Sequence, residues 1–174
     1  PAMGSWLSYG LGSETNELPS YVVLPDGRGA PNGGATNWSN GFLPAEYQGV
    51  IFRGGDKPVR DLFPATKLAS GADAATQNFI ATVNRKHLER VGENAALAAR
   101  IRSYELAAKM QLSIPEVSDV SGETEQTQQN YGITDETTAD MGRRCLLGRR
   151  LLERGVRFVQ LYSGDTGGWD AHKD

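Results

Sequence analysis

The sequence has almost no cysteine, no long apolar run and no large excess of charge of either sign. Cys145 is the only cysteine among 174 residues, which excludes an internal disulfide and a cysteine-rich zinc site. No apolar run approaches the roughly 20 residues that cross a bilayer, so no membrane span is predicted. With 18 Lys and Arg against 21 Asp and Glu, the net charge is −3, and the basic block typical of a nucleic-acid surface is missing.

The composition is that of a globular chain with a loop-rich first half. Hydrophobic residues make up 39% and charged residues 22% of the sequence, which is enough for one core. Glycine and proline are concentrated in the first seventy positions. The chain opens at Pro1 without an initiator methionine and stops at Asp174 in a polar stretch. We therefore expect residues 1–174 to be a single partial domain, an internal fragment of a larger one.

Hydrophobic periodicity predicts four helices and three short strands. The helices cover residues 4–12, 73–92, 94–112 and 138–154, and the strands cover 21–24, 47–53 and 156–162. Two polar stretches, 26–40 and 116–138, are predicted to be connections, the second with a turn near Tyr131-Gly132.

Helix ends are predicted from individual residues. Asp73 is expected to cap the second helix, Gly92 and Gly155 to follow the second and fourth helices, and Pro115 to stop the third. Two apolar stripes recur at helical spacing and are expected to pack inward: Phe79, Ile80, Val83, His87, Leu88 and Val91 in one helix, and Met141, Cys145, Leu147, Leu151 and Leu152 in another.

The end of the chain contains one αβ unit followed by a polar loop. The helix 138–154 leads through Gly155 into the strand 156–162, and the loop SGDTGGWDAH follows. This order predicts an α/β layer fold, in which ligands bind at the carboxyl ends of the strands.

That loop contains the candidate metal ligands. Asp165, Asp170 and His172 fall within eight residues, and carboxylates with imidazole form a suitable donor set for a metal ion. In an extended loop, the two-residue spacing places Asp170 and His172 on the same side of the backbone. The alternative is a solvated turn that uses Gly and Asp for their backbone tolerance, and the residues alone leave both interpretations open.

The remaining histidine, the cysteine and the paired arginines are expected to have structural rather than catalytic roles. His87 is expected to be a packed or half-exposed structural histidine, and Cys145 a small core residue rather than a nucleophile. The pairs Arg143/Arg144 and Arg149/Arg150 cannot act as clamps, because adjacent helical residues point about 100° apart. They predict a solvated face with ion pairs to residues such as Asp140 and Glu153. No serine lies in a G-x-S-x-G elbow.

Six segments carry a resemblance to one bacterial family: MGSWLSYGLGS, LPSYVVL, GFLPAEYQGVIFR, RSYELAAKMQLSIPEVSDVS, CLLGRRLLERGVRFVQLY and GWDAH. In this order they resemble the sulfatase-like domain-of-unknown-function family fifteen-oh-one, a relative of alkaline phosphatases and sulfatases. The resemblance extends from Met3 to His172.

The resemblance implies a partial α/β/α sandwich of the alkaline phosphatase/sulfatase type, helix-rich with a few strands. It implies a divalent metal ion, zinc or calcium, with Asp170 and His172 as ligands in the family's Trp-Asp-x-His motif, although Ala171 stands where a threonine is common. The implied function is hydrolysis of phosphate or sulfate esters, with a small-molecule or polysaccharide substrate and an extracytoplasmic location.

The family's nucleophile region and its later acidic and histidine motifs have no counterpart in this sequence, so we expect no turnover from the segment alone. The alternative is a sulfatase-like scaffold that binds a ligand or partner without chemistry.

Overall fold

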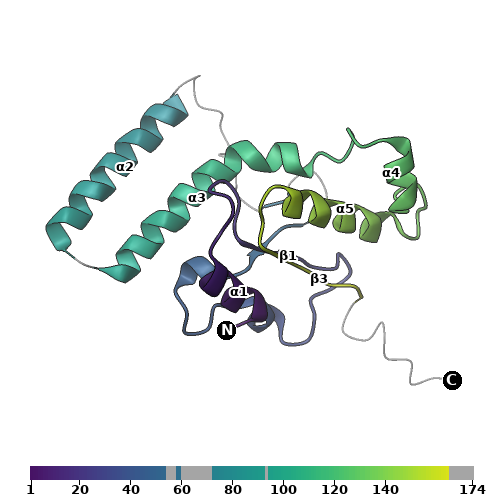
Figure 1. Cartoon of the computed structure of the whole chain (residues 1–174), viewed down its shortest axis with the longest axis horizontal. Helices are drawn as coiled ribbons and strands as arrows, with labels where there is room; N and C mark the ends of the chain where they lie inside the picture. The colour runs from purple at the N-terminus through teal and green to yellow at the C-terminus, as the bar shows by residue number, and fades with distance from the viewer. Residues whose placement is uncertain (54–57, 60–71, 93, 165–174) are drawn as a thin grey trace.

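A small parallel sheet organises the protein. The computed structural model describes residues 1–53, 58–59, 72–92 and 94–164. Within them, β1 (Tyr21–Leu24), β2 (Val50–Ile51) and β3 (Phe158–Leu161) form one sheet in the order β2-β1-β3, and β1 runs parallel to both neighbours (Figure 1). The α/β class predicted from the sequence is confirmed.

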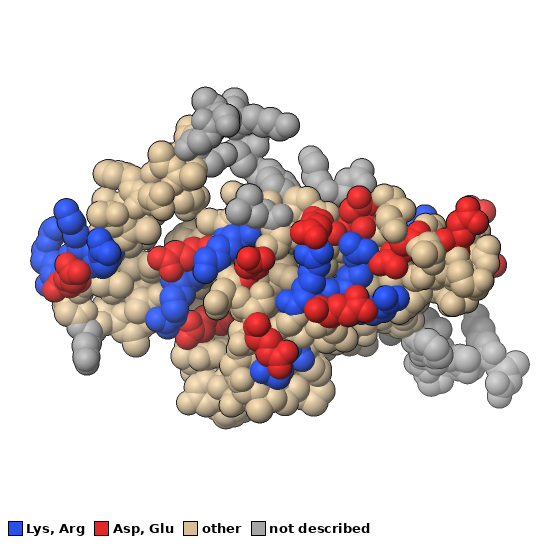
Figure 2. Space-filling view, turned by 45° about the horizontal axis from the view of Figure 1, so that its top comes forward, with Lys and Arg blue, Asp and Glu red and all other residues tan. Residues whose placement is uncertain are grey.

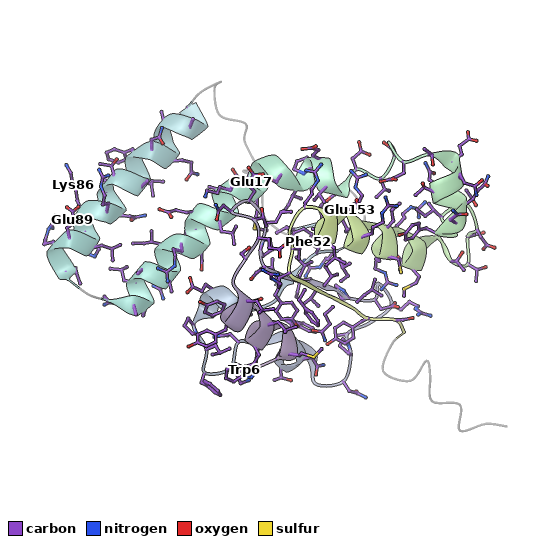
Figure 3. The ribbon with its side chains drawn as sticks, viewed as in Figure 1. Trp6, Glu17, Phe52, Lys86, Glu89 and Glu153 are labelled. Carbon is purple, nitrogen blue, oxygen red and sulfur yellow. The ribbon has the colours of Figure 1, made fainter. Side chains whose placement is uncertain are left out.

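The central strand β1 separates two apolar clusters, one on each face of the sheet. Val22 and Leu24 point to one face, where they pack with Ile114, Val117, Leu147 and Leu151. Tyr21 and Val23 point to the other face, where they pack with Trp38, Phe158 and Tyr162. This alternation follows from the period of two of a strand, and it gives the described part three layers. Figure 3 shows Phe52, which follows β2, inside the first cluster.

The described part of the chain contains five α-helices. They are α1 (Met3–Leu11), α2 (Ala72–Val91), α3 (Ala95–Ser118), α4 (Glu125–Asn130) and α5 (Ala139–Glu153), with short 3-10 turns at η1 (Gly34–Trp38) and η2 (Ala45–Tyr47). The four predicted helices are confirmed, whereas α4 and both 3-10 turns were not predicted. None of the helices in the described ranges is long and apolar enough to cross a membrane.

The predicted stop at Pro115 is wrong, because α3 continues through this proline to Ser118. A proline inside a helix costs about 3 kcal/mol. Its neighbours Ile114 and Val117 are fully buried in the core, and the carbonyl oxygens of Glu116 and Val117 accept hydrogen bonds from Arg150. Packing of this last turn therefore outweighs the local penalty.

The apolar stripe of α2 is also placed differently from its prediction. Phe79, Ile80 and Val83 are exposed, and so is His87, which does not pack into a core. Figure 1 shows the reason: α2 lies alongside the first half of α3 and away from the sheet. The helix begins at Ala72, so Asp73 lies in its first turn and not at its cap.

The glycine-rich front of the chain contains more order than its composition predicts. The stretch 26–40, expected to be a loop, contains η1, whose Trp38 is buried with its ring centre 6.0 Å from that of Tyr162. In the predicted strand 47–53, only Val50–Ile51 pairs with β1.

Charged side chains are distributed unevenly over the surface. Residues 1–13 and 29–45 contain no charged side chain. Figure 2 shows blue and red side chains gathered over the helical part, whereas the lower lobe of the molecule is largely tan.

Helix α5 packs on the sheet as its pattern predicts, and Gly155 follows it with a positive φ of 87°. Leu147 and Leu151 are buried and Cys145 is half-buried. Leu152 is the exception within the predicted stripe, because it faces solvent.

We predict that Leu151→Ala lowers the free energy of unfolding by about 2 to 5 kcal/mol, because it leaves a cavity between α5 and the sheet. Leu151 is 0% exposed and Leu152 is 52% exposed, so Leu152→Ala is the matched control and costs less than about 1 kcal/mol. Chemical denaturation followed by circular dichroism measures both. Equal losses in the two variants would contradict the orientation of α5.

Candidate functional site

The carboxyl ends of the three parallel strands meet at one edge of the sheet. β1 leads into Pro25-Asp26, and β3 leads into Tyr162 and then Gly164. This edge is where open α/β sheets bind ligands, and it is where the loop with the predicted metal ligands begins.

Asp26 is the centre of this edge, and both of its carboxylate oxygens are occupied. Its Oδ1 accepts hydrogen bonds from the backbone N–H and the Nε of Arg28, each at 2.9 Å. Its Oδ2 accepts from the backbone N–H of Gly164 at 2.7 Å, from Nη2 of Arg28 at 3.0 Å and from Nη2 of Arg144 at 3.2 Å. The side chain of Asp26 has no exposed surface. Asp26 therefore holds Gly164, the last described residue before the predicted metal ligands.

Arg144 reaches the same edge from α5 and is 3% exposed. Its Nη1 donates to the carbonyl oxygens of Tyr162 at 2.6 Å and Pro25 at 3.3 Å, and its Nε donates to Asp140 at 3.0 Å. One guanidinium thus ties together the ends of β1 and β3 and the first turn of α5. The predicted ion pair with Asp140 is confirmed, but the predicted solvated position of Arg144 is wrong, because its guanidinium is buried beside Asp26 and the strand ends.

Electrostatics at this edge favour an ionised Asp26. The hydrogen bond from the Arg28 side chain lowers the pKa of Asp26 most, and burial opposes it by raising the pKa. The backbone N–H groups of Arg28 and Gly164 and the charge of Arg144 lower it further, and the net result is a pKa far below the usual range. A carboxylate with this many donors is not available as a general base or metal ligand. Asp26 is a positioning residue.

The predicted ligands Asp165, Asp170 and His172 lie outside the described residues. Within the described ranges, no group of three or more His, Cys, Asp or Glu side chains is arranged to hold a metal ion. The structure fixes the start of the loop at Gly164, and the ligand positions stay a prediction from the sequence.

Arg149 and Arg150 of α5 take structural partners. Arg149 pairs with Glu153 within the helix at 2.7 Å, as the sequence predicts. Arg150 pairs with Glu123 at 2.6 Å and donates to the carbonyls at the end of α3, and so joins α5 to the α3–α4 connection. The two arginines thus bind different partners and do not form an oxyanion clamp, which agrees with the helical geometry.

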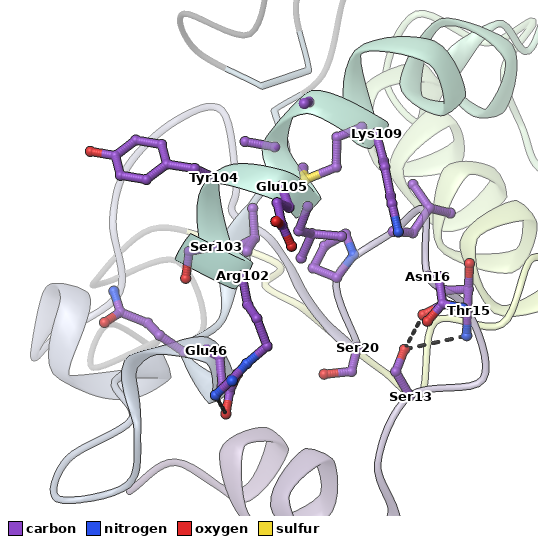
Figure 4. Close-up of a pocket in the computed structure, with 18 of the residues that line it drawn as sticks. Ser13, Thr15, Asn16, Ser20, Glu46, Arg102, Ser103, Tyr104, Glu105 and Lys109 are labelled. Carbon is purple, nitrogen blue, oxygen red and sulfur yellow. Dashed lines mark hydrogen bonds and ion pairs between the residues drawn. The ribbon is translucent and has the colours of Figure 1, made fainter. Parts of the chain in front are cut away.

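A hollow of about 1070 Å³ lies at the opposite, amino edge of the sheet (Figure 4). Its lining comes from α3 between Arg102 and Gln111, from the segment before β1 and from η2. Arg102 at this hollow forms a two-pronged pair with Glu46, at 2.7 and 3.1 Å. The charge of Arg102 is thereby neutralised by its own partner at this hollow.

The sequence did not indicate Asp26. For Arg144 it indicated the ion pair with the exposed Asp140 but not the buried one with Asp26. The signal in the sequence is weak: an aspartate in a Pro-Asp-Gly turn after a strand is typical of any surface turn. The partner of Asp26 is 118 positions away in the sequence.

Comparison with protein-family models found a match over residues 1–174 to the model described as "Protein of unknown function (DUF1501)". No curated protein and no solved structure matched the chain.

We predict that Asp26→Asn lowers the free energy of unfolding at pH 7 by about 3 kcal/mol, because it leaves Arg144 buried without its internal counter-charge. Since the native pKa of Asp26 lies below the unfolded value of about 3.9, its contribution is present above that value and is lost as the pH falls through the native pKa. The stability of the parent protein therefore falls more steeply between about pH 5 and pH 3 than that of the variant.

The matched control is Asp140→Asn, which removes the exposed partner of the same arginine and costs at most about 1 kcal/mol. Urea titrations at several pH values measure both variants. Parallel stability curves for the parent and Asp26→Asn would show that Asp26 is not the titrating anchor.

Proposed function

The chain belongs to the DUF1501 family, and on this premise we propose that it is the central part of a metal-dependent hydrolase of phosphate or sulfate esters. The observation that carries the proposal is the anchored start of the last loop. The backbone N–H of Gly164 is held by a buried, ionised Asp26 at the carboxyl edge of the parallel sheet. Asp170 and His172 follow within eight residues of this anchor.

The chemistry of the donor set fits zinc better than calcium. Zinc is bound by imidazole together with carboxylate, whereas calcium takes oxygen ligands only. Asp26 does not serve as an additional ligand, because its two oxygens already accept five hydrogen bonds. The remaining ligands and the nucleophile are proposed to come from other parts of the full-length protein.

The chain's own residues have two tasks in this proposal. Arg144 and Asp26 fix the strand ends and the loop start, and so limit the positions open to the loop. His172 binds through a neutral ring nitrogen, and Asp170 adds a negative charge. The chemistry supplied by the ion is polarisation of the ester oxygen and activation of an attacking group. An extracytoplasmic location and a small-molecule or polysaccharide ester substrate are part of the same proposal.

Elemental analysis of the full-length protein tests the metal ligands. We predict that the parent protein binds zinc and that Asp170→Ala/His172→Ala loses it. His87→Ala is the matched control, because the other histidine of the chain is exposed on α2, and this variant keeps its zinc. Equal zinc content in the parent and the double variant removes Asp170 and His172 as ligands.

Zinc content is also expected to depend on pH. Because neutral imidazole is the binding form, affinity weakens as the pH falls through the histidine range near about 6.5. Equilibrium dialysis against buffered zinc between pH 5 and pH 8 measures this. An affinity that is flat over the whole range would contradict an imidazole ligand.

Hydrolysis of aryl phosphate and aryl sulfate esters tests the reaction. The zinc-loaded full-length protein is expected to hydrolyse at least one of them, and the double variant neither. A zinc-loaded protein that is silent on both esters would favour the scaffold function over the hydrolase.

A further inference from the structure

Helix α1 buries small residues and exposes large apolar ones. Its buried residues are the small Gly4, Ser5 and Ser8. Four of its five large apolar side chains, Met3, Trp6, Tyr9 and Leu11, are exposed, and the fifth, Leu7, is half-buried. A surface helix normally buries its apolar side and exposes its polar side. The solvent-facing side of α1 therefore has the apolar composition of a buried surface. Figure 3 shows Trp6 on this side.

The exposed side chains of α1 join a ring from a distant segment. Phe42 is 77% exposed, and its ring centre lies 5.6 Å from that of Trp6. Trp6 and Tyr9 are 6.1 Å apart, and Tyr9 lies 5.3 Å from Tyr47 at the border. We call the five exposed residues the aromatic patch: Met3, Trp6, Tyr9, Leu11 and Phe42.

The aromatic patch is held rigidly on the sheet. A side-chain carbon added to Gly4 would lie 2.6 Å from both Tyr21 and Phe158, so the helix backbone rests directly on these rings. The N–H of Ala2 and the hydroxyl of Ser5 both donate to the carbonyl oxygen of Ser39, at 2.9 and 3.2 Å. The rings are thus presented in a fixed arrangement, which lowers the entropic cost of binding.

The chemistry of the patch restricts its partner. Both segments that form it, 1–13 and 29–45, are free of charged side chains, and the lower lobe in Figure 2 is correspondingly tan. A highly charged partner therefore gains nothing here. The ring planes are inclined at 73° to 87° to one another, so they form no flat platform on which a sugar ring would stack. Such edge-to-face rings suit an interdigitating protein surface.

A second copy of the same patch satisfies these restrictions. In a two-fold interface each surface meets itself, so a charged patch repels its own copy, whereas a neutral one does not. At roughly 150 to 250 Å² for a large side chain, the exposed fractions of the five residues amount to about 450 to 760 Å² per copy. Two copies would bury about 900 to 1,500 Å² if the patch is fully covered, a range that includes the lower end of specific interfaces.

We infer that the aromatic patch is a self-association surface, on which two copies of the protein pair about a two-fold axis with Trp6 and Phe42 as anchors. This inference stands apart from the hydrolase proposal, because the patch and the carboxyl edge share no residue.

Sedimentation equilibrium of the full-length protein between about 1 and 100 µM tests it. The expected mass is that of a dimer, and Trp6→Ser/Phe42→Ser is expected to raise the dimer dissociation constant at least tenfold. Both residues are at the surface, so the fold is retained, which far-UV circular dichroism checks. Tyr9→Ser, a milder single change in the same patch, is expected to weaken the dimer in the same direction.

The matched control is Phe79→Ser/Ile80→Ser, which removes two exposed apolar side chains of α2 and leaves the dissociation constant unchanged. A monomer at every concentration, or a dimer that the patch variants do not weaken, would overturn the inference. The same holds for a monomer that sediments with zwitterionic phospholipid vesicles or binds a neutral glucan through Trp6.

Discussion

The buried ion pair between Asp26 and Arg144 is the interaction on which the carboxyl edge of this protein depends. Each charge would be costly to bury alone, because the interior replaces the solvation of water poorly. Together they bind each other and six further groups: the carbonyls of Pro25 and Tyr162, the N–H of Gly164, the carboxylate of Asp140, and the backbone N–H and guanidinium of Arg28. The pair therefore ties two strand ends to α5, and the position of each element depends on the others.

In this arrangement, the described residues at the carboxyl edge of the sheet have structural roles. Asp26 is ionised and hydrogen-bonded through both oxygens, and the two carboxylates Asp26 and Asp140 are balanced by the two arginines Arg28 and Arg144. The charged groups in the described part of this edge therefore all pair with one another. In the proposed function, reactive groups therefore come from the residues that follow Gly164 and from other parts of the full-length protein. The proposed role of Asp170 and His172 is consistent with this arrangement.

The two faces of the sheet differ in the way they are covered. On one face α3 and α5 supply large apolar residues that close a core around Val22 and Leu24. On the other face α1 approaches through Gly4, Ser5 and Ser8, which lets its backbone come close to Tyr21 and Phe158. Close packing through small residues leaves the large side chains of α1 on the outside, and this is why the aromatic patch exists.

The sequence by itself determined the local elements and the family. The strands Tyr21–Leu24 and Phe158–Leu161, the helix that ends before Gly155 and the turn near Gly132 follow from short-range periodicity and from residues with special backbone preferences. Only the tertiary structure decided that Arg144 is buried, that α3 passes through Pro115 and that the stripe of α2 faces outward. The physical reason is that burial depends on neighbours far away in the chain: Arg144 meets a carboxylate 118 positions distant, and no local pattern contains that partner.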